Sequence, residues 1–209
     1  MRGSAVSASA PDVASEVGTS KAAARIRAAA IEVFAAKGYG ATTTREIAAS
    51  LDLSPGAVYP HYKTKESLLF AISLEGHDSA LSAITKADQP TALPVDRLTS
   101  TVAAYVEWHA RNHSLARVVQ HELRSLSPEH FQAIAAIRRS TSKVFTRIIE
   151  SGDACGDFRT IDTEAATLAI TSLGVDVSRW FPSNTHSDPT ILAERYVELS
   201  LRMVGAQGV

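Results

Sequence analysis

The sequence predicts an all-α protein of about nine helices, with an N-terminal three-helix unit followed by a larger helical body. Apolar residues recur at helical spacing through most of the 209 residues, and no segment alternates between apolar and polar residues as a half-buried strand would. Gly, Pro and short polar clusters interrupt this pattern, as expected between helices. With 45% hydrophobic residues, the chain can bury one sizeable core or two small ones.

The first two helices can be placed from short-range signals. Residues 21–37 carry apolar side chains at helical spacing, and Gly38 is the residue type that commonly ends a helix. Thr43 and Glu46 have the spacing of a capping box, in which the threonine hydroxyl accepts from one amide and the carboxylate accepts from the other. The second helix is therefore expected to begin at Thr44.

A sharp turn and a short helix are expected next. Asp52 lies where the chain must reverse, and Asp tolerates the left-handed conformation that such a turn needs. Ser54 is the expected N-cap and Pro55 the first residue of a short helix, which Pro60 ends. Thr64 then caps a long helix. Helix, turn and short helix in this order predict a helix-turn-helix, which places its second helix in the major groove of DNA.

Side chains suited to DNA lie on and beside this unit. The small groups at 55–57 suit contact with a thymine methyl, so Thr44 and Arg45 are expected to carry much of the base recognition. Tyr59, His61 and Lys65 are expected on phosphates. The candidate DNA-binding residues are Thr43, Thr44, Arg45, Pro55, Gly56, Ala57, Tyr59, His61, Lys63 and Lys65.

Charge is distributed unevenly along the chain. The net charge is −1, which argues against indiscriminate binding to nucleic acid. Residues 21–65, however, hold seven Lys or Arg against three acidic residues, whereas residues 66–209 hold thirteen against seventeen. A basic N-terminal unit on an acidic body favours a protein that contacts DNA phosphates through one end.

Several motifs follow one another in this region: AIEVF at 30–34, GYGATT at 38–43, EIA at 46–48, LSPGAVY at 53–59, HY at 61–62 and KESLL at 65–69. In this order and without gaps, they resemble the DNA-binding domain of the TetR family of transcriptional regulators. Asp52 and Pro60 depart from the family pattern, which usually has Gly at the first position and often an aromatic or basic residue at the second. The resemblance implies a dimeric repressor that binds a palindromic operator and is released by a small hydrophobic effector.

The chain is expected to divide into three parts. Residues 1–20 show no helical or strand period and are predicted to form a flexible arm. Residues 21–66 form the helix-turn-helix domain, and residues 67–209 form the effector-binding and dimerisation domain.

Aromatic and histidine side chains in the body could line a mostly apolar effector pocket. The candidates are Tyr105, Trp108, His109, His113, His121, Phe145 and Trp180. Residues 122–126 and 178–182 are similar to family members that respond to acyl-CoA thioesters. His109 and His113 share a helix face but have no third ligand of clear spacing, so neither a metal site nor a cofactor is predicted.

The last two helices are expected to form a four-helix interface in a homodimer. Apolar residues cover more of the circumference of residues 190–204 than one core-facing stripe requires, and the preceding helix is rich in small residues. The alternative is that all these residues are buried within one chain. The candidate interface residues are Ala169, Leu173, Val177, Leu192, Tyr196, Leu199 and Met203.

Other functional classes stay open at this stage. A helix-turn-helix-shaped corner also occurs in helical bundles, so an all-helical enzyme or a protein-binding adaptor would have a similar pattern. No nucleophile, base and orienting group have a recognisable arrangement, which argues against an enzyme. A single cysteine, Cys155, and the lack of a long apolar run or signal segment favour the cytoplasm and argue against membrane insertion.

Overall fold

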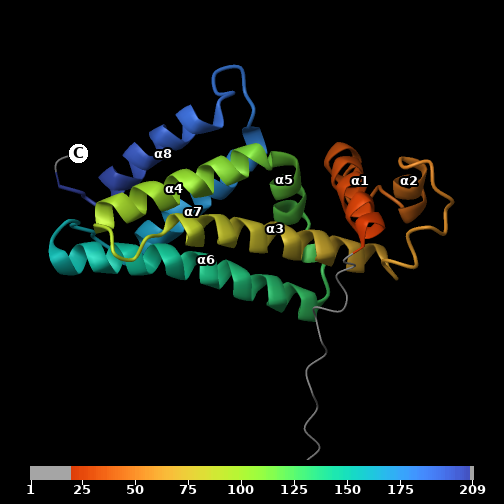
Figure 1. The fold of residues 1–209 in the computed structure, drawn as a ribbon, viewed down its shortest axis with the longest axis horizontal. Coiled ribbons are helices and arrows are strands. Elements are labelled where there is room, and N and C mark those ends of the chain that lie inside the picture. The colour runs from red at the N-terminus through yellow and green to blue at the C-terminus, as the bar shows by residue number, and fades with distance from the viewer. Residues whose placement is uncertain (1–19, 208–209) are drawn as a thin grey trace, which may run out of the picture.

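The computed structural model describes residues 20–207, which form eight α-helices, one short 3-10 helix and no strand. Helices α1 (Lys21–Lys37) and α2 (Thr44–Ala49) lie at one end of an elongated molecule, shown in red and orange in Figure 1. The rest comprises α3 (Lys65–Ala87), α4 (Pro94–Arg111), α5 (His113–His121), η2 (Leu123–Ser125), α6 (Pro128–Cys155), α7 (Thr163–Trp180) and α8 (Pro189–Met203). The all-α fold is confirmed.

The predicted helix starts are confirmed where capping residues identified them. Thr43 and Glu46 form both halves of the capping box in front of α2. The Thr64 hydroxyl accepts a hydrogen bond from the Ser67 amide at 2.9 Å and begins α3. Gly38 ends α1 with a φ of 82°, a conformation that residues with a Cβ rarely adopt.

The expected short helix at Pro55 is the one predicted helix that does not form as a regular helix. Residues 55–61 instead make consecutive turns, in which the amide of Tyr59 donates to the carbonyl of Gly56 at 3.2 Å. In an α-helix this carbonyl would accept from residue 60, but that residue is Pro60 and has no N–H. Asp52, which precedes these turns, has the expected left-handed conformation with a φ of 56°.

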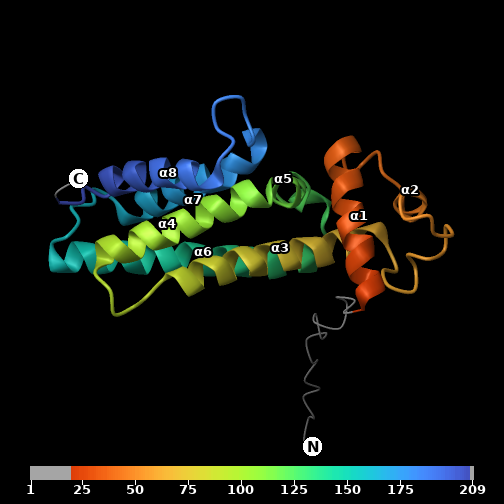
Figure 2. The ribbon, with the colours of Figure 1, turned by 45° about the horizontal axis from the view of Figure 1, so that its top comes forward.

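Two clusters of buried side chains form the interior, and the division between them does not follow the predicted domain boundary. We call the end of the molecule that contains α1 and α2 the head, and the rest the body. The head core contains α1, α2, the first two turns of α3, and Val118, Val119 and Ile134 from the body. The body core contains α4, α7 and α8 together with the C-terminal parts of α3 and α6. In both Figure 1 and Figure 2, α3 runs without a break from the head along α6. A continuous helix and a shared core therefore connect the two ends of the molecule.

None of the helices within residues 20–207 has the combination of length and apolar character needed to cross a bilayer.

Candidate nucleic-acid interface and ligand cavity

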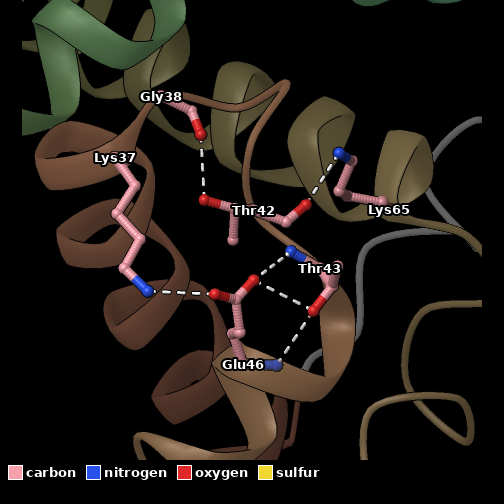
Figure 3. A network of polar contacts seen from close by, with 6 residues as sticks. All are labelled: Lys37, Gly38, Thr42, Thr43, Glu46 and Lys65. Carbon is pink, nitrogen blue, oxygen red and sulfur yellow. Dashed lines mark hydrogen bonds and ion pairs between the residues drawn. The ribbon is translucent and has the colours of Figure 1, made fainter.

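A polar network fixes the start of α2 (Figure 3). The carboxylate of Glu46 accepts from the amide of Thr43 at 2.8 Å and from Nζ of Lys37 at 2.9 Å. The hydroxyl of Thr43 accepts from the amide of Glu46 at 3.2 Å. The hydrogen bond from Lys37, followed by those from Thr43, lowers the pKa of Glu46 to about 2. The cap therefore stays charged at neutral pH, and it holds the two helices of the head in a fixed relation.

Lys65 makes contacts within the head that the sequence did not predict. Its Nζ donates to the backbone carbonyls of Tyr39 and Thr42, both at 2.8 Å, and lies 4.2 Å from the centre of the Tyr39 ring. Figure 3 shows the bond to Thr42. These contacts link α3 to the loop before α2. Two of the three N–H donors of the Lys65 ammonium group are thus used within the head, and its contact with a phosphate stays a prediction.

The other candidate DNA-binding residues lie around the same end of the head. Arg45, Tyr59 and Lys63 are exposed, and their side chains make no hydrogen bond or ion pair with any other described residue. Nδ1 of His61 lies 3.5 Å from Oγ of Ser20, at the start of α1. The remaining candidates are exposed or partly buried around the turn: Thr43, Thr44, Pro55, Gly56 and Ala57. This surface offers one guanidinium, one ammonium and one phenol that are free to meet a phosphate strand or a base edge.

A cavity of about 310 Å³ lies between α3, α4, α5, α6 and α7. Three of the predicted effector residues line it: Tyr105, Trp108 and His109. The lining residues that the sequence pattern did not predict include Gly76, His77, Ala116, Val119, Gln120, Arg138, Thr141, Leu168, Thr171 and Val175. His77 could have been found as a polar residue within the apolar stripe of α3, since it is buried on the same face as Ile84.

Four other predicted effector residues lie outside the cavity, and these assignments are corrected. Phe145 is fully buried behind Tyr105, with ring centroids 5.4 Å apart. His113 and Trp180 both pack against Phe181 instead. His121 is exposed on the surface of α5. Periodicity indicated which residues turn inward but not which of them border an opening, because that depends on how five helices meet.

Two buried histidines give the cavity its polar character. Nδ1 of His77 lies 2.8 Å from the carbonyl of Ser73, and Nδ1 of His109 lies 2.8 Å from the carbonyl of Tyr105. Burial lowers the pKa of both imidazoles to about 4, so both are neutral at neutral pH. Arg138, exposed on α6, donates from Nη1 to Oε1 of Gln120 at 2.6 Å. The cavity thus combines apolar and polar side chains with two neutral rings, the cation of Arg138 and the carboxylate of Asp176.

Helix α5 separates the cavity from the head. Ala116 and Val119 line the cavity, while Val118 on the same helix is buried in the head core. Leu115 packs against that core from α5 and faces Gly76, where an added Cβ would lie 3.5 Å from its side chain. Any shift of α5 that enlarges the cavity must therefore change its contact with α1 and α3.

Two family models match this chain. The model described as "Bacterial regulatory proteins, tetR family" matches residues 26–72, and the model described as "Tetracyclin repressor-like, C-terminal domain" matches residues 91–204. The chain belongs to the TetR family. The first model covers most of the head with its capped α2, and the second covers most of the residues that line the cavity.

Individual relatives agree with this placement. A TetR-family regulatory protein from Rhodococcus RHA1, solved by crystallography, is 78% identical in sequence to this chain. The match covers 90% of this chain and 99% of the Rhodococcus chain, and the two structures superimpose with a TM-score of 0.88. The fatty acid metabolism regulator protein of Bacillus subtilis is 25% identical over 173 residues, which are 82% of this chain and 89% of the relative. FadR from Bacillus subtilis, solved in complex with stearoyl-CoA, shares the fold with a TM-score of 0.70 at 24% identity, covering 87% and 98% of the two chains.

The last two helices of this TetR protein carry an apolar surface. Leu168 and Leu173 on α7 and Ile191, Leu199 and Met203 on α8 are exposed, with Leu168 at 65% and Leu199 at 50%. Of the predicted interface residues, Ala169 and Tyr196 are half-buried. Val177 and Leu192 are buried in the core of their own chain and are corrected, because a residue without exposed area cannot form a contact surface.

Proposed function

We propose that this protein is a dimeric transcriptional repressor that binds a palindromic operator and leaves it when an acyl-CoA thioester occupies the cavity. The observation that carries this proposal is the position of α5, one face of which lines the cavity while another packs into the head core. Such a repressor would act in the cytoplasm, where both the operator and acyl-CoA thioesters are found.

Contact with DNA is assigned to the free side chains of the head. Arg45 lies in the first turn of α2, beside the capped N-terminus, and its guanidinium is suited to bidentate contact with a base edge. Tyr59 and Lys63 are placed on phosphates, where they fix the register of the protein on the duplex. Lys65 has one N–H donor left for a phosphate, because the other two bind carbonyls of the head.

The dimer is assigned to the exposed apolar surface of α7 and α8. A second copy would cover Leu168, Leu173 and Leu199, which a monomer would leave in water. Two-fold symmetry then holds two heads at the separation of half-sites, roughly 34–36 Å. Analytical ultracentrifugation should find a dimer for the native protein and a monomer for Leu199→Asp. Ile161→Asp, at an exposed site on the loop before α7, is the matched control and should leave the dimer intact.

The acyl thioester is favoured by the size and chemistry of the cavity. Its volume of about 310 Å³ is at the lower end of ligand pockets, which suits an acyl chain, with the CoA nucleotide outside. Arg138 is exposed at the cavity wall, where it can meet an anionic group of such a ligand. The stearoyl-CoA bound by the Bacillus subtilis relative supports the same class.

Coupling between effector and operator is assigned to α5. A ligand shifts a conformational equilibrium only by the difference in its affinity for the two states. Because α5 contacts both the cavity and α1, a conformation with α5 displaced outward would accept the effector better and would reposition the head. In a dimer, this would change the separation of the two heads.

A gel-shift assay with duplex DNA flanking the protein's own gene tests the proposal. We expect retardation at low salt and release by acyl-CoA thioesters. Ala116→Met, which fills the cavity, should retain DNA binding and respond only at higher thioester concentration, while His121→Met on the exposed side of the same helix should respond as the native protein does. Failure to retard any duplex would refute the DNA assignment, and retardation insensitive to every thioester would refute the effector class.

A further inference from the structure

The two cavity histidines are fixed in one tautomer by their backbone contacts. A carbonyl oxygen only accepts hydrogen bonds, so the Nδ1 atoms that lie 2.8 Å from the carbonyls of Ser73 and Tyr105 must carry the ring protons. Burial lowers the pKa of both rings to about 4, so neither ring carries a second proton at neutral pH. Nε2 of both His77 and His109 is therefore a bare acceptor.

Nε2 of His77 is a buried acceptor without a partner. Three buried side-chain atoms among the described residues lack a hydrogen bond, and His77 is the only one of their three residues that lines the cavity. The side chain is more than nine-tenths buried, with an exposed fraction of 8% for the residue. Buried polar atoms are nearly always hydrogen-bonded in folded proteins, so this unpaired acceptor on a residue of the cavity wall favours a ligand that supplies a donor.

Two side-chain donors elsewhere on the cavity wall are already used. Nε1 of Trp108 donates to Oγ of Ser79 at 3.0 Å, and the hydroxyl of Thr171 donates to the carbonyl of Thr167 at 2.8 Å. Arg138 donates to Gln120 across the wall. Gly76 and Ala80, on the same helix as His77, add only small apolar groups to the cavity wall.

We propose that the effector carries a hydrogen-bond donor, a hydroxyl or an amide N–H, which Nε2 of His77 accepts inside the cavity. The inference rests on the proposed effector function of the cavity. It makes the site selective: a hydroxyl at the correct carbon is favoured over a plain methylene, and a keto group at the same carbon is disfavoured, because it would place a second acceptor against the first.

A matched panel of CoA thioesters tests the proposal on the native protein. The acyl chains carry a hydroxyl, a keto group or no polar group at the same carbon, and that carbon is varied along the chain. Calorimetric titration should find one position at which the hydroxylated thioester binds roughly 5-fold tighter than the plain one, the expectation for a single neutral hydrogen bond, while the keto thioester binds more weakly than both.

Two substitutions identify the residue and the source of the donor. His77→Leu should abolish the preference for hydroxyl, and His77→Gln, whose amide both donates and accepts, should accept the keto thioester as well. His121→Leu on the exposed side of α5 is the control and should leave the preference unchanged. If the donor is an amide of the CoA moiety, His77→Leu will weaken the plain thioester while the hydroxyl adds nothing.

The results separate this inference from the function on which it rests. If no thioester binds the native protein, the effector class itself is refuted. If plain thioesters bind, the native protein shows no preference within the panel and His77→Leu binds them equally well, the effector class survives and the role of His77 is refuted. Thermal unfolding of each variant, measured without ligand, shows whether it is folded.

Discussion

The head and the body of this molecule are stabilised by contacts of different range. In the head, Lys37, Thr43 and Glu46 lie within ten residues of one another and hold α1 and α2 through charged hydrogen bonds at the surface. In the body, the cavity is formed by five helices spread over a hundred residues, and the two histidines on its wall are buried and neutral. The head is thus stabilised by groups that stay charged, whereas the body depends on groups that must stay uncharged.

Acidification should break the body before the head. His77 and His109 have pKa values of about 4 in the folded state against 6.5 in a free ring, so the unfolded chain binds more protons between these values. Stability is therefore complete above pH 6.5 and is lost as the pH falls toward 4, by about 3 kcal/mol for each ring.

Glu46 behaves in the opposite way. Its folded pKa of about 2 lies below its ordinary value of 4.5, so its contribution is lost only as the pH falls through that lower window. Urea unfolding followed from pH 7 to 5 should show a decline that His77→Leu and His109→Leu each reduce and that the control His121→Leu does not. A flat profile in the native protein would contradict the neutral state of the two rings.

Gly174→Ala tests how tightly the body is packed. An added Cβ would lie 2.5 Å from Cδ1 of Tyr105, a ring that lines the cavity and is buried. Overpacking of this kind destabilises a protein by roughly 1–3 kcal/mol and displaces the neighbouring ring. Thermal unfolding measures the loss, with Gly40→Ala, where nothing lies within 4 Å, as the control. Equal melting temperatures for Gly174→Ala and the native protein would show that Tyr105 moves freely.

Arg45→Ala tests the head without disturbing its network. The guanidinium makes no hydrogen bond or ion pair within the described part of the chain, so the fold should be unchanged. Loss of a bidentate base contact weakens specific binding by roughly 1–3 kcal/mol and relaxes selection at that base pair. Binding-site selection measures this change in base preference, and an unchanged preference in Arg45→Ala would contradict the assigned role of Arg45.

Lys63→Ala should instead weaken binding to all DNA sequences alike. It should also reduce the dependence of the affinity on salt concentration by about one ion.

Thr43→Ala should have the smallest effect on stability. It removes the hydroxyl that accepts from the amide of Glu46 but leaves the bond between the Glu46 carboxylate and the backbone of residue 43. Loss of an N-cap typically destabilises a protein by about 1 kcal/mol. Hydrogen exchange should show faster opening of α2 with little change in α4 or α7. Thr43→Ser, which retains a capping hydroxyl, should exchange as the native protein does.

The two regions also differ in how well the sequence predicts them. The capping box at Thr43, the turn at Asp52 and the cap at Thr64 depend on neighbours within three residues, and all three are confirmed. The helix expected at Pro55 failed for an equally local reason, since Pro60 removes the amide that its second turn required. Local chemistry was therefore sufficient for the head, provided that every backbone donor was counted.

The cavity could be predicted only in part. Tyr105, Trp108 and His109 line it as expected because one helical face of α4 carries all three. Phe145 is equally apolar and buried, but it lies one layer behind the cavity wall. The role of His77 required the distance from its ring to the Ser73 carbonyl and the absence of a partner at Nε2, neither of which spacing alone can supply.

The turns at 55–61 have a thermodynamic consequence for operator binding. The carbonyl of Gly56 accepts from the amide of Tyr59, three residues later, at 3.2 Å, whereas in an α-helix it would accept from the amide four residues later. The segment therefore has fewer backbone constraints than a regular helix. Ordering it against a groove reduces conformational entropy at the moment of binding. Operator association by this head should therefore show a favourable enthalpy opposed by an ordering entropy, and its affinity should fall more steeply on warming than that of a head with a preformed recognition helix.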